Sequence, residues 1–398
     1  MIVSTTEFLR RNNGHTVLPE TRPYRFNQAR PPGDVADDTP DPLDRIHALG
    51  FAGHARAAAE LAGEKAAATW GPGHGNPGAG PGTAMTAFRL EQAAAYWLGV
   101  AGEAQLAIGR LEALAETHLR YCRDGSGAPG YRELLEARND LAYWRGTSGD
   151  PDGALELFEE LLADAVTVFD RHDSHVLAAR NNTAYWRAVN GDIKRALVEY
   201  RRLQTDSERI LGAAHRDTLM VRNNLAFWHG ESGDAGGALE RFEQLLPDVL
   251  RLMEPDDFYV LSARNNVAYW RGFNRDARGA LEQYRMLLDD CRRTLGDRDY
   301  HTLSARLQLG LWSGVAGDLD EAIAALGELL PAVEKELGGS HELSFSVRHQ
   351  LARWHGARGD AHEAVAILGP LVTEQQRVLG AQDYRTLASQ GLLSRYSS

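Results

Sequence analysis

The sequence is poor in cysteine and in long apolar runs, and each shortage excludes a class of protein. Cys122 and Cys291 stand far apart and outside any CxxC pattern, which excludes a disulfide framework and a thiolate zinc site. No run of about 18 apolar residues occurs, and residues 1–10 lack the basic and apolar regions of a signal peptide. We therefore expect a protein of the reducing cytoplasm that neither spans a membrane nor is exported.

Basic residues are outnumbered by acidic ones, 43 to 55. A net charge of −12 and a pI near 5.6 argue against a nucleic-acid partner, which would normally require a basic patch. The few lysines are Lys65, Lys194 and Lys335, and this bias toward arginine, with abundant alanine and glycine, is typical of GC-rich, actinobacterial genomes. Hydrophobic residues at 43% and charged residues at 25% match an ordinary folded protein.

Motifs of catalysis and of metal binding are missing too. The sequence contains no GxxxxGK[ST], no HExxH and no GxSxG. His172 and His175 form a lone HxxH without a third ligand, which surface histidines explain better than a metal site. We expect no catalytic residues, no metal and no cofactor.

What the sequence has instead is an internal repeat. One tryptophan recurs at a constant step of 42 residues, at Trp144, Trp186, Trp228, Trp270, Trp312 and Trp354. An arginine stands six residues before each of them, at Arg138, Arg180, Arg222, Arg264, Arg306 and Arg348. An aspartate stands six residues after each, at Asp150, Asp192, Asp234, Asp276, Asp318 and Asp360. A constant step of this length indicates stacked copies of one structural unit.

Each unit is predicted to be a pair of helices, A and B. Four residues after each aspartate comes an alanine, and four further on comes a large apolar residue, as in Ala238 and Phe242. A small residue followed by a large one at this spacing lets two helices approach closely and fill the next turn. Glycine precedes every aspartate except Asp276, which indicates that helix A ends there and that the aspartate caps helix B. The tryptophans are expected to fill the seam between stacked pairs.

The unit resembles the tetratricopeptide repeat family, whose Leu-Gly/Ala, Gly, Ala and Phe/Tyr signature matches Leu225-Ala226, Gly233, Ala238 and Phe242. Its long period and the run of residues 223–226, Asn-Asn-Leu-Ala, look most like the kinesin-light-chain subtype found in long bacterial arrays. The resemblance covers about residues 131–396. It implies an all-α fold, a right-handed α-α superhelix (TPR solenoid) in which helix A of each pair lines the concave surface. Tryptophan stands where the subtype usually has an aliphatic residue.

The array is expected to occupy most of the chain. Six full units span residues 131–384, a degenerate capping unit spans 84–130, and a C-terminal capping helix spans 385–398. Residues 42–83 have the pattern of an Ala-rich helical pair followed by a Gly/Pro linker. Residues 1–41 are rich in proline and are expected to be extended or disordered. Within them, the partly basic stretch 16–36 is a candidate for intramolecular contact with the groove of the array.

Comparison of the six units with one another separates two kinds of position. Arginine, tryptophan, aspartate and alanine are kept in all six, as expected of residues that solve the same packing problem each time. A second group is kept only in the first four units and is replaced in the last two, for example by Leu307 and His349. Because a purely architectural need would not stop after four units, we interpret this second group as the lining of a groove.

The predicted peptide-binding residues all lie on helix A. They are the carboxamides Asn139, Asn181, Asn223, Asn265, Asn182, Asn224 and Asn266, the aromatic residues Tyr143, Tyr185, Phe227 and Tyr269, and the arginines Arg180, Arg222 and Arg264. A carboxamide both donates and accepts hydrogen bonds, which suits the backbone of an extended peptide. Two structural alternatives stay open: the asparagines satisfy hydrogen bonds between helices, and the arginines link helices through aspartate or carbonyl groups.

The sequence therefore predicts a non-catalytic scaffold that holds an extended peptide or a partner protein in its concave groove. A regulatory sensor that responds to a signalling peptide is the first alternative, and an enzyme with an unrecognised site in the groove is the second. Neither nucleic acid nor a membrane is an expected partner.

Overall fold

The computed structural model describes residues 41–51, 54–70, 81–123, 130–253, 257–381 and 383–397. Within these ranges the secondary structure is helical and no strand occurs, as the expected all-α class requires. The predicted N-terminal segment up to residue 40, including the stretch 16–36, and nearly all of the predicted Gly/Pro linker lie outside the described residues. The chain divides into two compact parts, and the border between them, Val221 and Arg222, falls inside helix α10.

The helices follow one another in pairs. Before the array come α2 (Pro42–Phe51) and α3 (Ala55–Trp70). The A helices are α4 (Pro81–Val100), α6 (Gly130–Thr147), α8 (Ser174–Val189), α10 (Arg216–Glu231), α12 (Phe258–Phe273), α14 (Tyr300–Ala316), α16 (Glu342–Arg358) and α18 (Tyr384–Ser397). The B helices are α5 (Ala104–Arg123), α7 (Pro151–Val168), α9 (Ile193–Ile210), α11 (Ala235–Leu252), α13 (Ala277–Leu295), α15 (Leu319–Leu337) and α17 (Ala361–Val378).

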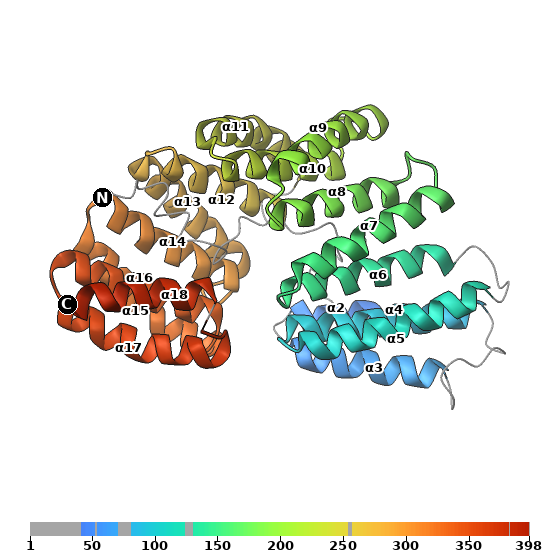
Figure 1. Ribbon diagram of the computed structural model, residues 1–398, viewed down its shortest axis with the longest axis horizontal. Coiled ribbons are helices and arrows are strands. Elements are labelled where there is room, and N and C mark those ends of the chain that lie inside the picture. Colours follow the sequence, from blue (N-terminus) through green and yellow to red (C-terminus); the bar gives the residue numbers. More distant parts are fainter. Residues whose placement is uncertain are drawn as a thin grey trace. The chain divides into compact units, whose positions relative to one another are not determined.

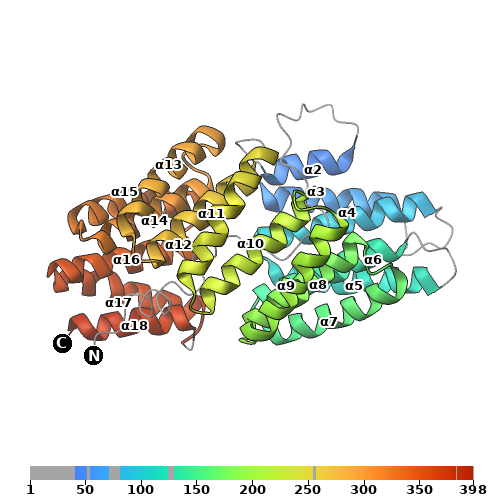
Figure 2. The same ribbon diagram turned by 90° about the horizontal axis from the view of Figure 1, so that it is seen from above.

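Neighbouring helices pack in the order of the sequence within each part. From α3 to α9 each helix contacts the next, and the A helices α4, α6 and α8 also contact one another in turn (Figure 1). The same holds from α11 to α18, where α14 contacts α16 and α16 contacts α18 (Figure 2). Within each part the pairs therefore form an α-α solenoid, because each helix packs against the next and several A helices also contact the A helix of the neighbouring pair.

The small and large residues of each B helix are fully buried. The repeated alanines are 0% exposed, at Ala154, Ala196, Ala238, Ala280, Ala322 and Ala364. The residues four positions further on are at most 1% exposed, at Phe158, Tyr200, Phe242, Tyr284, Leu326 and Leu368. This confirms the predicted pattern of close approach at one turn and space filling at the next, in which each large side chain contributes about 2–3 kcal/mol by burial.

The tryptophans fill the seam between successive A helices, as predicted, and all but Trp228 do so against a glycine; in the unit before Trp228, Ala188 stands at the place of that glycine. A Cβ on these glycines would lie 2.1–2.3 Å from an aromatic ring of the following unit. The pairs are Gly99 with Trp144, Gly146 with Trp186, Gly230 with Trp270, Gly272 with Trp312, Gly314 with Trp354 and Gly356 with Tyr396. The glycine stands two residues after the tryptophan of its own unit, so it removes the side chain that would otherwise keep the next ring out.

The turn between helix A and helix B depends on backbone conformation. The glycine before the capping aspartate adopts positive φ, for example 109° at Gly233 and 102° at Gly359. In the unit that lacks the glycine, Arg275 takes the same conformation with φ of 69°, which costs a non-glycine residue about 1–2 kcal/mol. The aspartate then caps helix B in four units, as Asp234 does by accepting from the N–H of Gly237 at 2.8 Å, whereas Asp318 and Asp360 make no such bond.

Candidate functional site

In the first part of the chain the predicted carboxamides bond to one another. Nδ2 of Asn181 donates to Oδ1 of Asn182 at 3.1 Å, and Nδ2 of Asn182 donates to Oδ1 of Asn139 at 2.6 Å. Asn139 donates in turn to Oδ1 of Asp140 at 3.5 Å. The other oxygen of Asp140, Oδ2, accepts from Nε2 of Gln92 at 2.9 Å. The donors converge on one carboxylate, an arrangement in which hydrogen bonds strengthen one another.

The second part repeats the link between neighbouring A helices. Nδ2 of Asn266 on α12 donates to Oδ1 of Asn223 on α10 at 2.8 Å, and Asn223 donates to Oδ1 of Asn224 at 3.4 Å. The exposed fraction then divides the predicted carboxamides into two groups. Asn139, Asn181, Asn182, Asn224 and Asn266 are at most 1% exposed, whereas Asn223 and Asn265 are half-buried. The geometry favours the alternative in which most of these amides satisfy hydrogen bonds between helices.

The aromatic residues of the predicted groove pack against the tryptophans. Tyr143, Tyr185, Phe227 and Tyr269 lie edge-on to the tryptophan that follows each of them, with ring centroids 5.0–5.4 Å apart. Tyr185, Phe227 and Tyr269 are 3–6% exposed, and only Tyr143 is half-buried. Most of this aromatic surface therefore contributes to the seam.

The repeated arginines connect helix A to helix B of the same unit. Arg180 pairs with Asp206 at 2.9 Å and Arg222 with Asp248 at 2.8 Å, and Arg264 forms the same pair with Asp290. In each case the acid stands 26 residues after the arginine, and the pair is the link between helices through an aspartate that the structural alternative described. The arginine side chains still expose 19–28% of their surface. At the equivalent place after Arg306 stands Ala332, and this arginine has no ion pair among the described residues.

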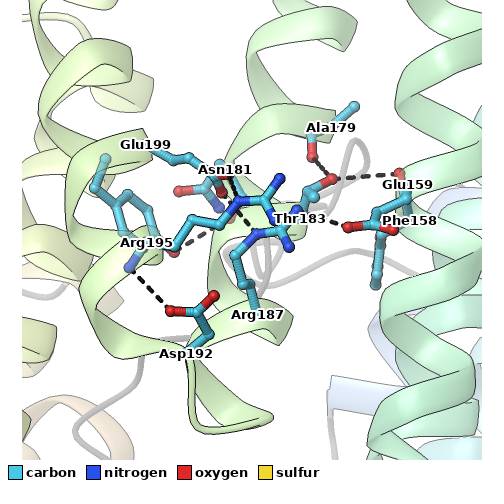
Figure 3. A network of polar contacts seen from close by, with 10 residues as sticks. Phe158, Glu159, Ala179, Asn181, Thr183, Arg187, Asp192, Arg195 and Glu199 are labelled. Atoms are coloured by element: carbon cyan, nitrogen blue, oxygen red, sulfur yellow. Dashed lines mark hydrogen bonds and ion pairs between the residues drawn. The ribbon is translucent and has the colours of Figure 1, made fainter.

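A second ion-pair network joins α7, α8 and α9 of two neighbouring helix pairs. Arg187 on α8 donates to Glu159 on α7 at 2.6 Å and to Glu199 on α9 at 3.0 Å (Figure 3). Arg195 shares Glu199 at 3.2 Å. Tyr200 closes the same region by donating to the carbonyl of Asn181 at 3.1 Å. This network holds α7, α8 and α9 together, and its central guanidinium, that of Arg187, is only 9% exposed.

The last two units use different polar contacts at the amide positions. Leu307 replaces the first carboxamide with an apolar side chain that is 3% exposed. His349 replaces it in the next unit, where its Nδ1 lies 3.0 Å from Oγ of Ser389 on α18. Burial, with a smaller contribution from the charge of Arg353, lowers the pKa of His349 to about 4. This histidine is therefore neutral at physiological pH and belongs to the packing of the C-terminal helix.

An acidic cluster on α6, which the sequence reasoning missed, faces α4. Glu133, Glu136 and Asp140 lie at spacings of three and four residues and so share one face of the helix. Glu133 binds Arg89 of α4 at 3.3 Å. Burial, followed by the charges of Asp140 and Glu133, raises the pKa of Glu136 to about 7. The signal in the sequence was the acidity of residues 131–140, Tyr-Arg-Glu-Leu-Leu-Glu-Ala-Arg-Asn-Asp, since no other unit has carboxylates at all three positions.

Two kinds of site receive no support from the residues that the structure describes. No group of three or more His, Cys, Asp or Glu side chains there is arranged to hold a metal ion. None of the helices in the same ranges combines the length and the apolarity that a bilayer crossing requires.

Comparisons with known proteins identify the fold. No family model matches the chain, and no curated protein matches it. A Rap protein complexed with competence and sporulation factor aligns at 11% identity over 89% of this chain and 96% of its own, with a TM-score of 0.54. A signal-transduction ATPase with a tetratricopeptide repeat sensor, from Pyrococcus horikoshii, is 11% identical over 79% of this chain and 49% of its own, with a TM-score of 0.51. Yeast Tom70 is 12% identical over 93% of this chain and 67% of its own, with a TM-score of 0.50. At such identities the likeness shows the fold alone, which is that of tetratricopeptide-repeat proteins.

Proposed function

We propose that this protein is a non-catalytic, cytoplasmic scaffold that binds an extended peptide segment along its A helices. The observation that carries this proposal is that the A helices keep a few half-buried side chains of acidic, aromatic, amide and hydroxyl chemistry on a packed framework that does not change. They are Glu136, Tyr143, Asn223, Ser262 and Asn265. A rigid framework with variable accessible positions is the arrangement from which repeat proteins build binding surfaces.

The predicted peptide-binding residues have different roles in this proposal. The half-buried Tyr143, Asn223 and Asn265 contact the peptide. The buried carboxamides fix the spacing of the A helices, and Arg180, Arg222 and Arg264 fix the angle between helix A and helix B while presenting part of the guanidinium. Since a pre-organised surface loses little entropy on binding, the buried carboxamides would contribute to affinity without touching the ligand.

Two finer points are part of the same proposal. The constant 42-residue step and the Asn-Asn-Leu-Ala run of α10 support the kinesin-light-chain-like subtype in a bacterial protein. The Rap protein whose fold this chain shares was crystallised with competence and sporulation factor, which supports a ligand for this fold but does not name one here. Docking of residues 16–36 in the groove stays a prediction from their sequence.

Partner capture with paired variants tests the proposed function. We expect the full chain to retain a partner from its host lysate, and Tyr143→Ala with Asn265→Ala to weaken that binding by about tenfold, or roughly 1.4 kcal/mol. The control replaces two exposed residues of B helices, Val198→Ala and Val378→Ala, and should leave the affinity unchanged. If the control weakened binding as much as the test variant, or only the control did, the binding surface would not lie on the A helices.

A further inference from the structure

The ion pair that joins helix A to helix B is interrupted in one unit. In the other five units the repeated arginine binds a carboxylate that stands 26 residues later: Arg138 with Asp164, Arg180 with Asp206, Arg222 with Asp248, Arg264 with Asp290 and Arg348 with Glu374. In the unit of α14 and α15 the arginine, Arg306, is kept, but Ala332 stands at the place of the acid. A methyl group accepts no hydrogen bond, so this guanidinium lacks the partner that the five equivalent arginines have.

A second partner is missing at the same place. In the next unit, Nε and Nη2 of Arg348 also donate to Glu334 on the preceding B helix, α15, at 3.1 and 2.8 Å. The residue 42 positions before Glu334 is Arg292 on α13, so a cation stands where Arg348 has a carboxylate. Burial, followed by the charge of Arg292, lowers the pKa of Arg306. Positive charge at Arg306 is therefore not balanced as it is at Arg348.

The acids in the surroundings of Arg306 do not fill this gap. Asp297 and Glu328 act on it through their charge, but neither forms an ion pair with it. Asp297 accepts from Nε of Arg292 at 2.9 Å, and Glu328 is exposed on α15. Arg306 is half-buried and has no hydrogen bond and no ion pair within the part of the chain that the structure describes. It has lost part of its hydration without gaining an acceptor, which favours any anion that supplies one.

The place of the missing acid is accessible from solvent. In the five complete units the side chains of the paired acids expose 20–55% of their surface. Ala332 itself is only partly buried, and Arg292 is exposed. A carboxylate of another molecule can therefore reach the position that the acid of the chain occupies elsewhere.

We infer that Arg306, assisted by Arg292, binds the carboxylate of an aspartate or glutamate side chain of a partner, at the place left open by Ala332. The inference goes beyond the proposed function, because it concerns a unit in which the amide row of the groove is not kept. A guanidinium presents two parallel N–H donors that match the two oxygens of a carboxylate. One such contact is weak by itself, so we expect a dissociation constant on the order of 1 mM for a small probe.

The test is an NMR titration of the full chain with arginine labelled by nitrogen-15, at neutral pH and physiological salt. The probes are an acetylated, amidated Gly-Glu-Gly peptide and the same peptide with glutamine, which replaces the single carboxylate by an amide of the same shape. The Nε–H signal of Arg306 is the one that disappears in Arg306→Lys. We expect the glutamate peptide to shift this signal saturably and the glutamine peptide to bind at least about tenfold more weakly. Equal responses to the two peptides, or no response to either, would overturn the inference.

A variant that restores the missing acid provides a second, independent test. Ala332→Asp supplies a carboxylate from within the chain, so it should raise the melting temperature and weaken binding of the glutamate peptide at least about tenfold. The control, Ala324→Asp, adds the same charge at an exposed position of α15, about 12 Å away along the helix axis. Charges at that separation are largely screened at physiological salt, so the control should change the affinity less than about twofold.

The comparison of the two aspartate variants separates a defined site from general repulsion. Equal weakening by both variants, or undiminished binding in a folded Ala332→Asp protein, would contradict the assignment. If Ala332→Asp failed to fold, the comparison of the glutamate and glutamine peptides would still decide, because it uses the natural chain.

Inorganic phosphate distinguishes a carboxylate site from a phosphate site. A guanidinium also pairs with phosphate, but the second negative charge of a phosphate would be repelled by Asp297 and Glu328, which both act on Arg306. We therefore expect phosphate to bind no more tightly than the glutamate peptide at matched ionic strength. Tighter binding of phosphate would show that the site takes a different ligand and would overturn the assignment of a carboxylate.

Discussion

Replacing Gly314 by alanine is expected to lower the free energy of unfolding by about 2–3 kcal/mol. The added Cβ would lie 2.2 Å from the Trp354 ring, a separation that forces the ring or the helices to move. Helix propensity alone predicts the opposite sign, since alanine favours a helix over glycine by about 1 kcal/mol. The sign of the effect therefore shows whether the glycine makes room for the ring. Thermal and urea unfolding, followed by circular dichroism, measure it.

The neighbouring helix provides a matched control. Gly327 lies within α15, and a Cβ there would meet nothing within 4 Å. Gly327→Ala should therefore stabilise the protein by about 0.5–1 kcal/mol, as expected for an exposed helical position. If both substitutions stabilised the protein, the close contact between glycine and tryptophan would not hold the A helices at their observed distance.

Replacing Glu136 by glutamine is expected to stabilise the protein at alkaline pH but not in acid. The pKa of Glu136 rises from 4.5 to about 7 on folding, so between these values the folded state holds a proton that the unfolded state has lost. Stability of the natural protein should thus fall as pH rises through this window, by about 1.4 kcal/mol per pH unit. Above about pH 7 the full free-energy cost of ionising Glu136 in the folded protein, about 3 kcal/mol, should be present.

The measurement is the difference in unfolding free energy between the two proteins across this pH range. Contributions from other titrating groups, such as buried His118 with its pKa lowered by burial to about 3, largely cancel in that difference. The difference should be constant below about pH 4.5, grow in favour of the variant with rising pH, and level off above about pH 7. A difference that does not change with pH would mean that Glu136 is not buried among like charges.

The helices of this fold were predictable because the residues that determine them recur at the same positions in each unit. The small and large pair of Ala238 and Phe242 fixed the packing face of helix B, and the glycine before each aspartate fixed the end of helix A. Repetition alone also contained one signal that the sequence reasoning passed over. The glycine two residues after the tryptophan recurs in every unit except the one that has Ala188, as at Gly272 and Gly314, and it explains how a ring fits into the seams that have it.

The candidate site was harder to predict, because its contacts join residues of different units. The bond from Asn182 to Asn139 depends on how α6 and α8 stack, and sequence spacing does not distinguish an amide that faces a ligand from one that faces the next helix. The partner of Arg222 is likewise Asp248 on the other helix of the pair, a position that the six-unit pattern did not single out because Ala332 interrupts it. Glu136 was missed because it belongs to one unit only.

Binding of the partner along the A helices can be tested by site-specific photo-crosslinking. A photoreactive phenylalanine analogue would replace Tyr143 on α6 in one sample and the exposed Val198 on α9 in another, each in the full chain exposed to its captured partner. We expect a covalent adduct with the partner from position 143 and none from position 198. An adduct from position 198 alone would place the partner on the B helices and contradict it.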